Sequence, residues 1–248
     1  MMRVDIITLL PQIFEKVFDE SVLGSAVKNG LIEVVLHQFR DYGDGRHKTV
    51  DDTPFGGGPG MVFKPAPLVN CIRDVRRLGI PAPVIGLTPQ GEPLNQNLVK
   101  ELARFDRIVL VCGRYEGFDE RIIHEFDFQL SIGDYVLTGG EIAAMTVVDA
   151  VSRMIPGTVG CQDSVIQDSF YEGLLDHPQY TRPAIWEGLA VPNVLQDGNH
   201  ALINNYRHSR SLLTTAVSRP DVFAASGLSE DDRDSLQTLL SPVDNKLK

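Results

Sequence analysis

One run in the middle of the chain decides the fold: Arg107-Ile108-Val109-Leu110-Val111-Cys112, followed at once by Gly113-Arg114-Tyr115-Glu116-Gly117. Every residue between Arg107 and the first glycine is apolar, and most are β-branched. This composition is typical of a strand buried on both faces, as in a parallel sheet covered by helices. A loop directly after such a strand is where open parallel sheets bind their ligands.

The same alternation of strands and helices extends to both sides of that run. Further strands are predicted at residues 4–10, 31–37, 83–87 and 128–132. Helices are predicted from Pro11 onward and at residues 65–78, 94–105 and 141–154. The pattern indicates an α/β fold with a mostly parallel sheet.

The character of the sequence changes after Ile155-Pro156-Gly157. Residues 160–168 are polar, which is typical of a linker, and the apolar residues beyond them follow helical spacing without strand alternation. We therefore predict an α/β domain at residues 1–160, an inter-domain linker at 161–168 and a small, mainly α-helical C-terminal domain at 169–248.

The composition is that of a globular protein, with 43% hydrophobic and 23% charged residues among 248. These values exclude a disordered chain, a collagen-like chain and a coiled-coil rod. The net charge of −10 argues against a broad polyanion-binding surface. It leaves room for local phosphate contacts by two basic clusters, which are Arg40, Arg46, His47 and Lys48, and Arg182, Arg207, His208 and Arg210.

The N-terminus and the cysteines indicate the compartment. No apolar run reaches the ~18 residues of a membrane span. The apolar start of the chain is interrupted by Asp5 and ends at Pro11, without the features of a signal peptide. Cys71, Cys112 and Cys161 are far apart and are predicted to be buried free thiols. We expect a cytoplasmic protein with no membrane partner.

Three glycine-rich segments, residues 53–61, 112–117 and 132–141, are candidates for a ligand site. Each alone is compatible with an ordinary tight turn. Two of them follow predicted strands, and glycine lets the backbone approach a ligand closely, so together they favour a ligand site. Neither a Gly-Lys-Ser/Thr loop nor a GxGxxG pattern is present, so the residues alone indicate only a nucleotide-like small molecule.

Taken together, these segments resemble the bacterial tRNA (guanine-N1)-methyltransferase family of the SPOUT class. The matching strings run in order through the first three quarters of the chain, and one of them is Ser131-Ile132-Gly133-Asp134-Tyr135. All of them lie at residues 2–9, 47–61, 110–117, 131–141, 153–157, 168–170 and 173–183. The chain departs from the family at Gly86 and Thr88, where a bulky aromatic residue and a serine are more usual.

The resemblance implies methyl transfer from S-adenosylmethionine to N1 of guanosine 37, beside the anticodon of tRNA. It also implies a parallel sheet with a SPOUT-type deep trefoil knot. An obligate homodimer with a shared site is implied as well, together with a need for Mg²⁺ whose binding position is unknown.

Carried onto this chain, the resemblance assigns individual site residues. The residues that it implies bind S-adenosylmethionine are Leu87, Thr88, Pro89, Gly113, Glu116, Gly117, Ile132, Gly133, Asp134, Tyr135, Val136, Leu137, Gly139 and Gly140. Those that seat the target guanine are Gly56, Gly57, Gly58, Pro59 and Gly60. Asp168 matches the proposed general base of the family, and Arg153 matches its catalytic arginine.

These residue types suit the reaction. N1 of guanine carries a proton and is a poor nucleophile until a base within hydrogen-bond reach removes it. Negative charge then builds on O6, where a guanidinium would stabilise it. Taken without the resemblance, Asp168 would be interpreted as a solvated linker carboxylate.

Three rival functions are weaker. A methyltransferase of the same class that acts on another RNA fits less well, because residues 168–183 match the tRNA family. An RNA-binding protein without catalysis does not explain why both Arg153 and Asp168 are present. A phosphate-binding NTPase would need the Gly-Lys-Ser/Thr loop that is missing.

Overall fold

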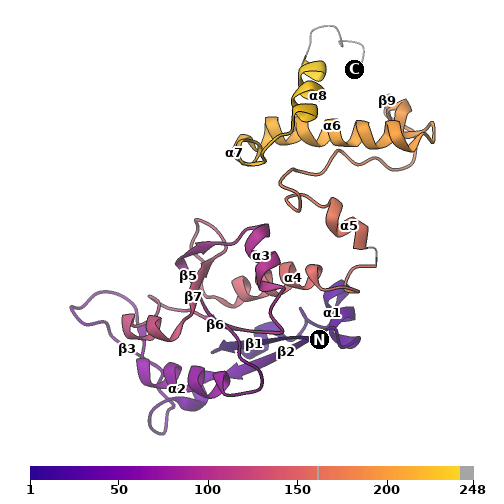
Figure 1. The fold of residues 1–248 in the computed structure, drawn as a ribbon. Helices are drawn as coiled ribbons and strands as arrows, with labels where there is room; N and C mark the ends of the chain where they lie inside the picture. Colours follow the sequence, from indigo (N-terminus) through magenta and orange to yellow (C-terminus); the bar gives the residue numbers. More distant parts are fainter. Residues whose placement is uncertain (161, 241–248) are drawn as a thin grey trace. The chain divides into compact units, whose positions relative to one another are not determined.

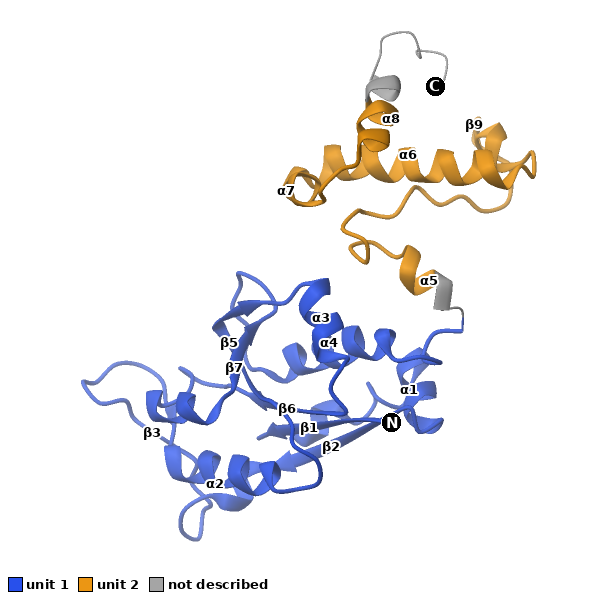
Figure 2. Ribbon diagram, in the orientation of Figure 1, with its two compact units in different colours: residues 1–162 blue, residues 163–248 orange. Residues whose placement is uncertain are grey.

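The structure, a computed structural model, describes residues 1–160 and 162–240 (Figure 1). The chain divides into two compact units, residues 1–162 and 163–248 (Figure 2). Each unit is described by itself below.

The first unit contains a five-stranded sheet in the order β2-β1-β6-β5-β7. All neighbouring strands are parallel, which confirms the predicted α/β fold with a parallel sheet. The central run is observed as β6, with the predicted bounds. The five strands are β1 (Met2–Thr8), β2 (Ile32–Gln38), β5 (Val84–Pro93), β6 (Arg107–Cys112) and β7 (Phe128–Ser131).

Helices cover both faces of this sheet, each over its own apolar core. On one face, α1 (Ser21–Lys28), α3 (Gln96–Leu102) and α4 (Glu141–Met154) pack against the even-numbered residues of β1. On the other face, α2 (Pro65–Arg76) packs against Ile7 of β1. The shorter elements are η1 (Pro11–Phe14), η2 (Phe39–Tyr42), β3 (Asp51–Asp52), β4 (Val62–Phe63) and η3 (Glu120–Glu125).

Two local expectations are wrong. The helix predicted from Pro11 is a single 3₁₀ turn, η1, and the helix of this region is α1, which was not predicted. The strand predicted at residues 83–87 does not end there, because β5 continues to Pro93. The pairing of β5 with β7 shifts register between Leu87 and Glu92, so the added part of the strand is irregular.

The second unit contains mostly helices. Its α5 lies where the sequence predicts a linker. Its short hairpin of β8 and β9 was not predicted, and it exposes Ile185, Trp186 and Leu189. The elements are α5 (Gln162–Gln167), β8 (Ile185–Trp186), β9 (Leu189–Ala190), η4 (Asn193–Leu195), α6 (His200–Ser218), α7 (Pro220–Ala225) and α8 (Glu230–Leu240).

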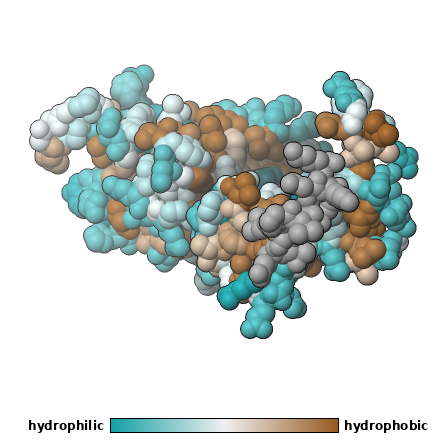
Figure 3. All heavy atoms as spheres, turned by 90° about the horizontal axis from the view of Figure 1, so that it is seen from above, coloured by the Kyte–Doolittle hydropathy of each residue, from teal (hydrophilic) through white to brown (hydrophobic). Residues whose placement is uncertain are grey.

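The sequence predictions for the surface and the cysteines are tested only by the described residues, which include two of the three cysteines. Among the described residues, no helix combines the length and apolarity that crossing a membrane requires. The face in Figure 3 mixes hydrophilic and hydrophobic residues. Cys71 and Cys112 are free and buried, as predicted, and burial raises the pKa of the Cys71 thiol to about 12. Cys161 lies outside the described residues.

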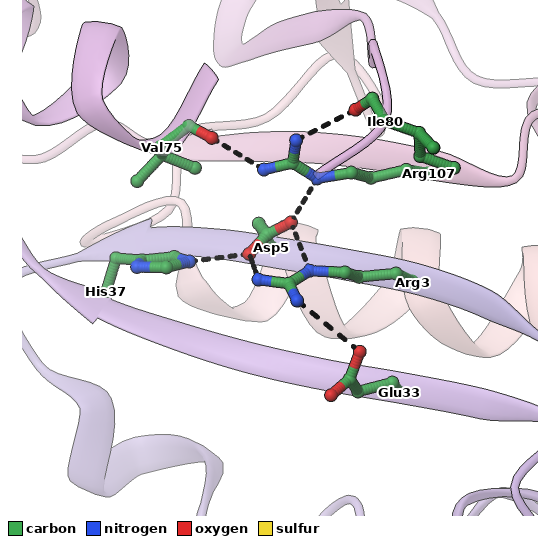
Figure 4. Close-up of polar contacts among 7 residues, drawn as sticks. All are labelled: Arg3, Asp5, Glu33, His37, Val75, Ile80 and Arg107. Carbon is green, nitrogen blue, oxygen red and sulfur yellow. Dashed lines mark hydrogen bonds and ion pairs between the residues drawn. The ribbon is translucent and has the colours of Figure 1, made fainter. Parts of the chain in front are cut away.

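A charged cluster is buried on the α2 side of the sheet (Figure 4). The side chains of Asp5 on β1 and Arg107 on β6 are both inaccessible to solvent, and Nε of Arg107 donates to Asp5 at 2.7 Å. Arg3 donates to both oxygens of the same carboxylate at 2.9 and 2.8 Å. Nε2 of His37 on β2 lies 2.6 Å from Asp5 Oδ1. The carboxylate is therefore bound to side chains from three strands.

The remaining N–H groups of Arg107 bind the end of α2. They donate to the carbonyl oxygens of Val75 at 2.6 Å and Ile80 at 2.9 Å (Figure 4). Burial by itself would raise the pKa of Asp5. The hydrogen bonds from His37, Arg3 and Arg107 outweigh it and hold that pKa well below the ordinary carboxyl value.

Arg107→Met should destabilise the protein strongly. It leaves the Asp5 carboxylate buried without its buried partner, which costs about 3–5 kcal/mol of unfolding free energy. Urea denaturation at pH 7 measures the loss. The control is Arg77→Met, which removes an exposed ion pair with Asp74 and should cost less than about 1 kcal/mol. Equal losses in the two variants would contradict the role of Asp5 and Arg107.

Asp5→Asn should reduce the sensitivity of stability to acid. Because the pKa of Asp5 is depressed in the folded state, its contribution is present above the unfolded-state value of about 4 and is lost as pH falls below it. The variant should therefore lose stability less steeply below about pH 4, by up to ~1.4 kcal/mol per pH unit. Urea denaturation across this range measures the slope, and the exposed Asp74→Asn should keep the wild-type slope.

Candidate functional site

A cavity of about 390 Å³ lies at the carboxyl ends of β6 and β7, beside the irregular part of β5. Most of the residues that the sequence assigns to the methyl donor line it: Leu87, Thr88, Pro89, Gly113, Glu116, Gly117, Ile132, Tyr135, Val136, Leu137, Gly139 and Gly140. Gly133 and Asp134 do not line it. Three segments far apart in the sequence thus share one cavity, at the edge of a parallel sheet where ligands bind.

Part of the cavity wall is backbone packed too closely for a side chain. The N–H of Gly140 donates to the carbonyl of Gly113 at 2.7 Å, and a Cβ at Gly140 would lie 2.8 Å from the Cα of Cys112. Arg114 and Gly139 form an isolated antiparallel bridge beside this contact. The loop after β6 and the start of α4 are therefore joined directly through their main chains.

A buried carboxylate that was not predicted from the sequence connects the same two segments to β1 by hydrogen bonds. Glu141, in the first turn of α4, is 2% exposed. Its Oε1 accepts from Oγ1 of Thr8 at 2.9 Å, and its Oε2 accepts from Nη1 of Arg114 at 3.0 Å. Thr8 ends β1, and Arg114 lines the cavity. The position of Glu141 after two glycines gave no sign of partners 133 and 27 residues away.

Tyr115 is a strained residue in the cavity wall. Its φ is 59°, a conformation that costs a non-glycine residue energy and is often found at functional sites. Its ring packs edge-on against Phe63 with centroids 5.3 Å apart. Burial and a hydrogen bond with Asp51 of β3 raise the pKa of its hydroxyl. Tyr115 lies between the two glycines of residues 113–117, and this position in a glycine-rich segment after a strand is the signal that could have marked it.

The loop at Gly56–Gly60 is attached to the rim of this cavity. Its glycines at 56, 57, 58 and 60 all adopt positive φ, and Phe55 beside them is fully exposed. The N–H of Glu116 donates to the carbonyl of Met61 at 3.0 Å. A Cβ at Gly60 would meet Oε1 of Glu116. The structure therefore joins this predicted substrate loop to the rim of the predicted donor cavity.

The two predicted catalytic residues belong to different units. Arg153 lies in the last turn of α4 in the first unit. Asp168 follows α5 in the second unit, is half-buried, and its carbonyl accepts from the N–H of Tyr171 at 3.2 Å. A second cavity, of about 400 Å³, has Asp168 in its wall.

Cys112, at the end of β6 beside the first cavity, does not supply a nucleophile. Cys112 is buried, and its burial together with the charge of Glu141 raises the pKa of its thiol well above the ordinary value, so the thiolate is not available as a nucleophile. In the first basic cluster, Lys48 is paired with Asp41. Within the described residues, no group of three or more His, Cys, Asp or Glu side chains could hold a metal ion.

The comparisons with known proteins agree with each other. A family model described as tRNA (Guanine-1)-methyltransferase TrmD matches residues 2–225. A tRNA (guanine-N(1)-)-methyltransferase of Syntrophotalea carbinolica is 48% identical over 241 residues, 97% of this chain and 98% of the relative. One of Geotalea uraniireducens is 50% identical over 240 residues, 96% and 97% of the two chains. One of Dehalococcoides mccartyi is 48% identical over 97% and 98%.

Gly140→Ala should destabilise the first unit, because the added Cβ forces the backbone of Cys112 and Gly113 to move. The expected loss of unfolding free energy is about 1–3 kcal/mol. The matched control is Gly160→Ala, where a Cβ meets nothing within 4 Å and the change should stay within about 0.5 kcal/mol. Urea denaturation of both variants measures these losses. An unchanged unfolding free energy in Gly140→Ala would show that the contact between the two segments can relax at no cost.

Proposed function

Since this chain belongs to the tRNA (guanine-1)-methyltransferase family, we propose that it transfers a methyl group from S-adenosylmethionine to N1 of guanosine 37 in tRNA, with Asp168 as the general base. The observation that carries the proposal is the cavity at the strand ends, because two of the segments that line it, those after β6 and after β7, lie in strings that resemble the family. The family match extends through Asp168 and most of the second unit.

The cavity fits S-adenosylmethionine on its own structural features. Its volume of about 390 Å³ is within the range of small-molecule sites. Leu87, Ile132 and Leu137 give it an apolar wall for a flat base. Gly139 and Gly140 add wall that has no side chain, since an added Cβ would collide with the side chain of Arg114 or the backbone of Cys112. Backbone N–H and C=O groups in such a cradle read the edge of an adenine without needing charged side chains.

When bound there, S-adenosylmethionine supplies an electrophilic methyl group on its positively charged sulfur. Asp168 accepts the N1 proton of the guanine as N1 attacks, so the new N1–carbon bond forms while the sulfur–carbon bond breaks. The products are N1-methylguanosine, S-adenosylhomocysteine and a proton on the Asp168 carboxyl. Arg153 stabilises the negative charge that develops on O6 of the guanine.

The Gly56–Gly60 loop contacts the target nucleotide in this proposal. Its backbone is free of side chains at four glycines, so it approaches RNA closely and offers N–H groups. Its link through Met61 to Glu116 connects it to the rim of the donor cavity.

Three finer features stay predictions that accompany this proposal. They are the deep trefoil knot, the homodimer with a shared site and the cytoplasmic location. The magnesium requirement also stays a prediction, with its binding position unknown.

Methyl transfer to two tRNA transcripts, with guanosine or adenosine at position 37, tests the function. Labelled methyl should appear only on the guanosine transcript. Asp168→Asn should lower kcat by about 10²–10⁴-fold, because it removes the base. Its affinity for S-adenosylhomocysteine should be unchanged, since the donor cavity lies in the first unit.

The matched control for this test is the exposed Asp197→Asn in the second unit, which should keep wild-type activity. Equal labelling of both transcripts would move the target away from position 37. Full activity in Asp168→Asn would keep the enzyme class and remove Asp168 as the base.

A further inference from the structure

Phe55, in the loop between β3 and β4, holds its whole side chain in solvent. The residue is 100% exposed, although an aromatic ring is among the largest apolar groups that folding can bury. A single exposed apolar side chain is ordinary on a protein surface, so the position of Phe55 in the loop matters more than its exposure.

The backbone around Phe55 forms a tight turn. The N–H of Gly57 donates to the carbonyl of Pro54 at 3.2 Å, which places Phe55 and Gly56 at the two central positions of a β-turn. Gly56 has a φ of 85°, as the third residue of a type II turn requires. The glycine that follows Phe55 therefore allows the turn that presents its ring.

The far end of this loop is fixed to the rim of the first cavity. The N–H of Glu116 donates to the carbonyl of Met61 at 3.0 Å, and the N–H of Phe63 donates to the carbonyl of Gly117 at 3.2 Å. Glu116 and Gly117 line the cavity, whereas Phe55 is not among the described residues that do. The ring is thus placed to contact the part of a substrate that stays outside the cavity.

A positively charged turn precedes β3. Asp44 and Thr49 exchange main-chain hydrogen bonds at 3.0 Å across this turn, and Arg46 and His47 are exposed within it. The carboxylate of Asp44 is paired with Lys64, which follows β4, and this pair connects the turn to the base of the loop. Proteins that bind single-stranded nucleic acids combine such cationic groups with aromatic rings on which bases stack.

We propose that the ring of Phe55 stacks on a base of the tRNA next to the nucleotide that is methylated. The inference rests on the proposed function, which brings the target nucleotide to the rim of the first cavity. Bases of RNA loops are free to stack on aromatic side chains, and stacking needs no hydrogen bond to the base. Phe55 is then a positioning residue, which holds the neighbouring base while the target base enters the site.

The surroundings of Phe55 favour a base over other occupants. A protein partner needs a contiguous apolar patch, but the exposed neighbours of Phe55 along the chain are Asp52, Thr53 and residues 56–60, of which four are glycine. The target base itself must lie within reach of the methyl donor, in a cavity that Phe55 does not line. One flat ring on a glycine-rich turn fits one flat base.

Phe55→Ala should weaken the equilibrium binding of tRNA by about 5–150-fold, the effect of losing one base–aromatic stack. Phe55→Trp and Phe55→Tyr should keep wild-type affinity, because either ring can stack. Phe55→Leu should lose affinity as the alanine variant does, since a leucine side chain is apolar without a flat face. Filter binding or fluorescence anisotropy with the full-length protein measures these constants.

A tRNA that lacks one base tests which partner the ring has. Transcripts made abasic on either side of position 37 should separate the two neighbours. At one of these positions, the missing base should weaken binding by the wild-type protein about 5–150-fold more than binding by Phe55→Ala. Equal effects in the two proteins at both positions would overturn the proposal.

The matched control is Phe105→Ala, which removes a 44% exposed ring just before β6, at the edge of the sheet opposite the cavity. It should keep wild-type affinity for tRNA. Affinity for S-adenosylhomocysteine and the urea midpoint should be unchanged in Phe55→Ala, which separates loss of stacking from loss of folding. Wild-type tRNA affinity in Phe55→Ala or in Phe55→Leu would refute stacking by Phe55. If the wild-type protein does not methylate guanosine 37, the proposed function itself fails.

Discussion

A carboxylate that water cannot reach organises the first unit. Asp5 lies on the middle of three neighbouring strands, and a buried charge is tolerated only when it is paired and hydrogen-bonded. Its partners come from β6 on one side and β2 on the other, so the pairing of both neighbours is fixed in register. A slip by one residue would turn Arg107 or His37 to the opposite face. Arg107 also holds the end of α2, so one charge cluster positions three strands and a helix.

The sheet could be predicted from the sequence because its strands are almost wholly apolar, and a buried parallel strand needs that composition. The bounds of β6 and α4 are the predicted ones. Helix α1 could not be found in the same way, because Gly24 interrupts its short sequence. The structure shows why glycine is there: a Cβ at Gly24 would overlap the backbone of Asp19. The β8–β9 hairpin was missed because two-residue strands carry no periodicity.

The candidate site was predictable where it depends on topology. Loops after parallel strands meet at one edge, so the glycine-rich segments had to lie close together. The side chains that support them were not predictable. In the sequence, Asp5 is recognisable only as a charge that interrupts an apolar run, and Glu141 only as the first residue of a predicted helix. Each is explained by partners more than 100 residues away, Arg107 and Thr8 respectively. The two cavities also differ in lining: of the described residues, four glycines line the first and none lines the second, where Asp168, Glu172, Asp176 and Asp232 contribute carboxylates.

The order of the strands has a consequence for co-translational folding. β1 is made first, but one of its two neighbours in the sheet, β6, is made about a hundred residues later. Until Arg107 leaves the exit tunnel, the carboxylate of Asp5 lacks its buried counter-ion, and β1 has no neighbour on that side. Domains fold as units during synthesis, and parallel pairings of long sequence separation form slowly. The side of β1 that faces β6 must therefore stay unpaired until the middle of the chain has been made, although β2 is already available on the other side.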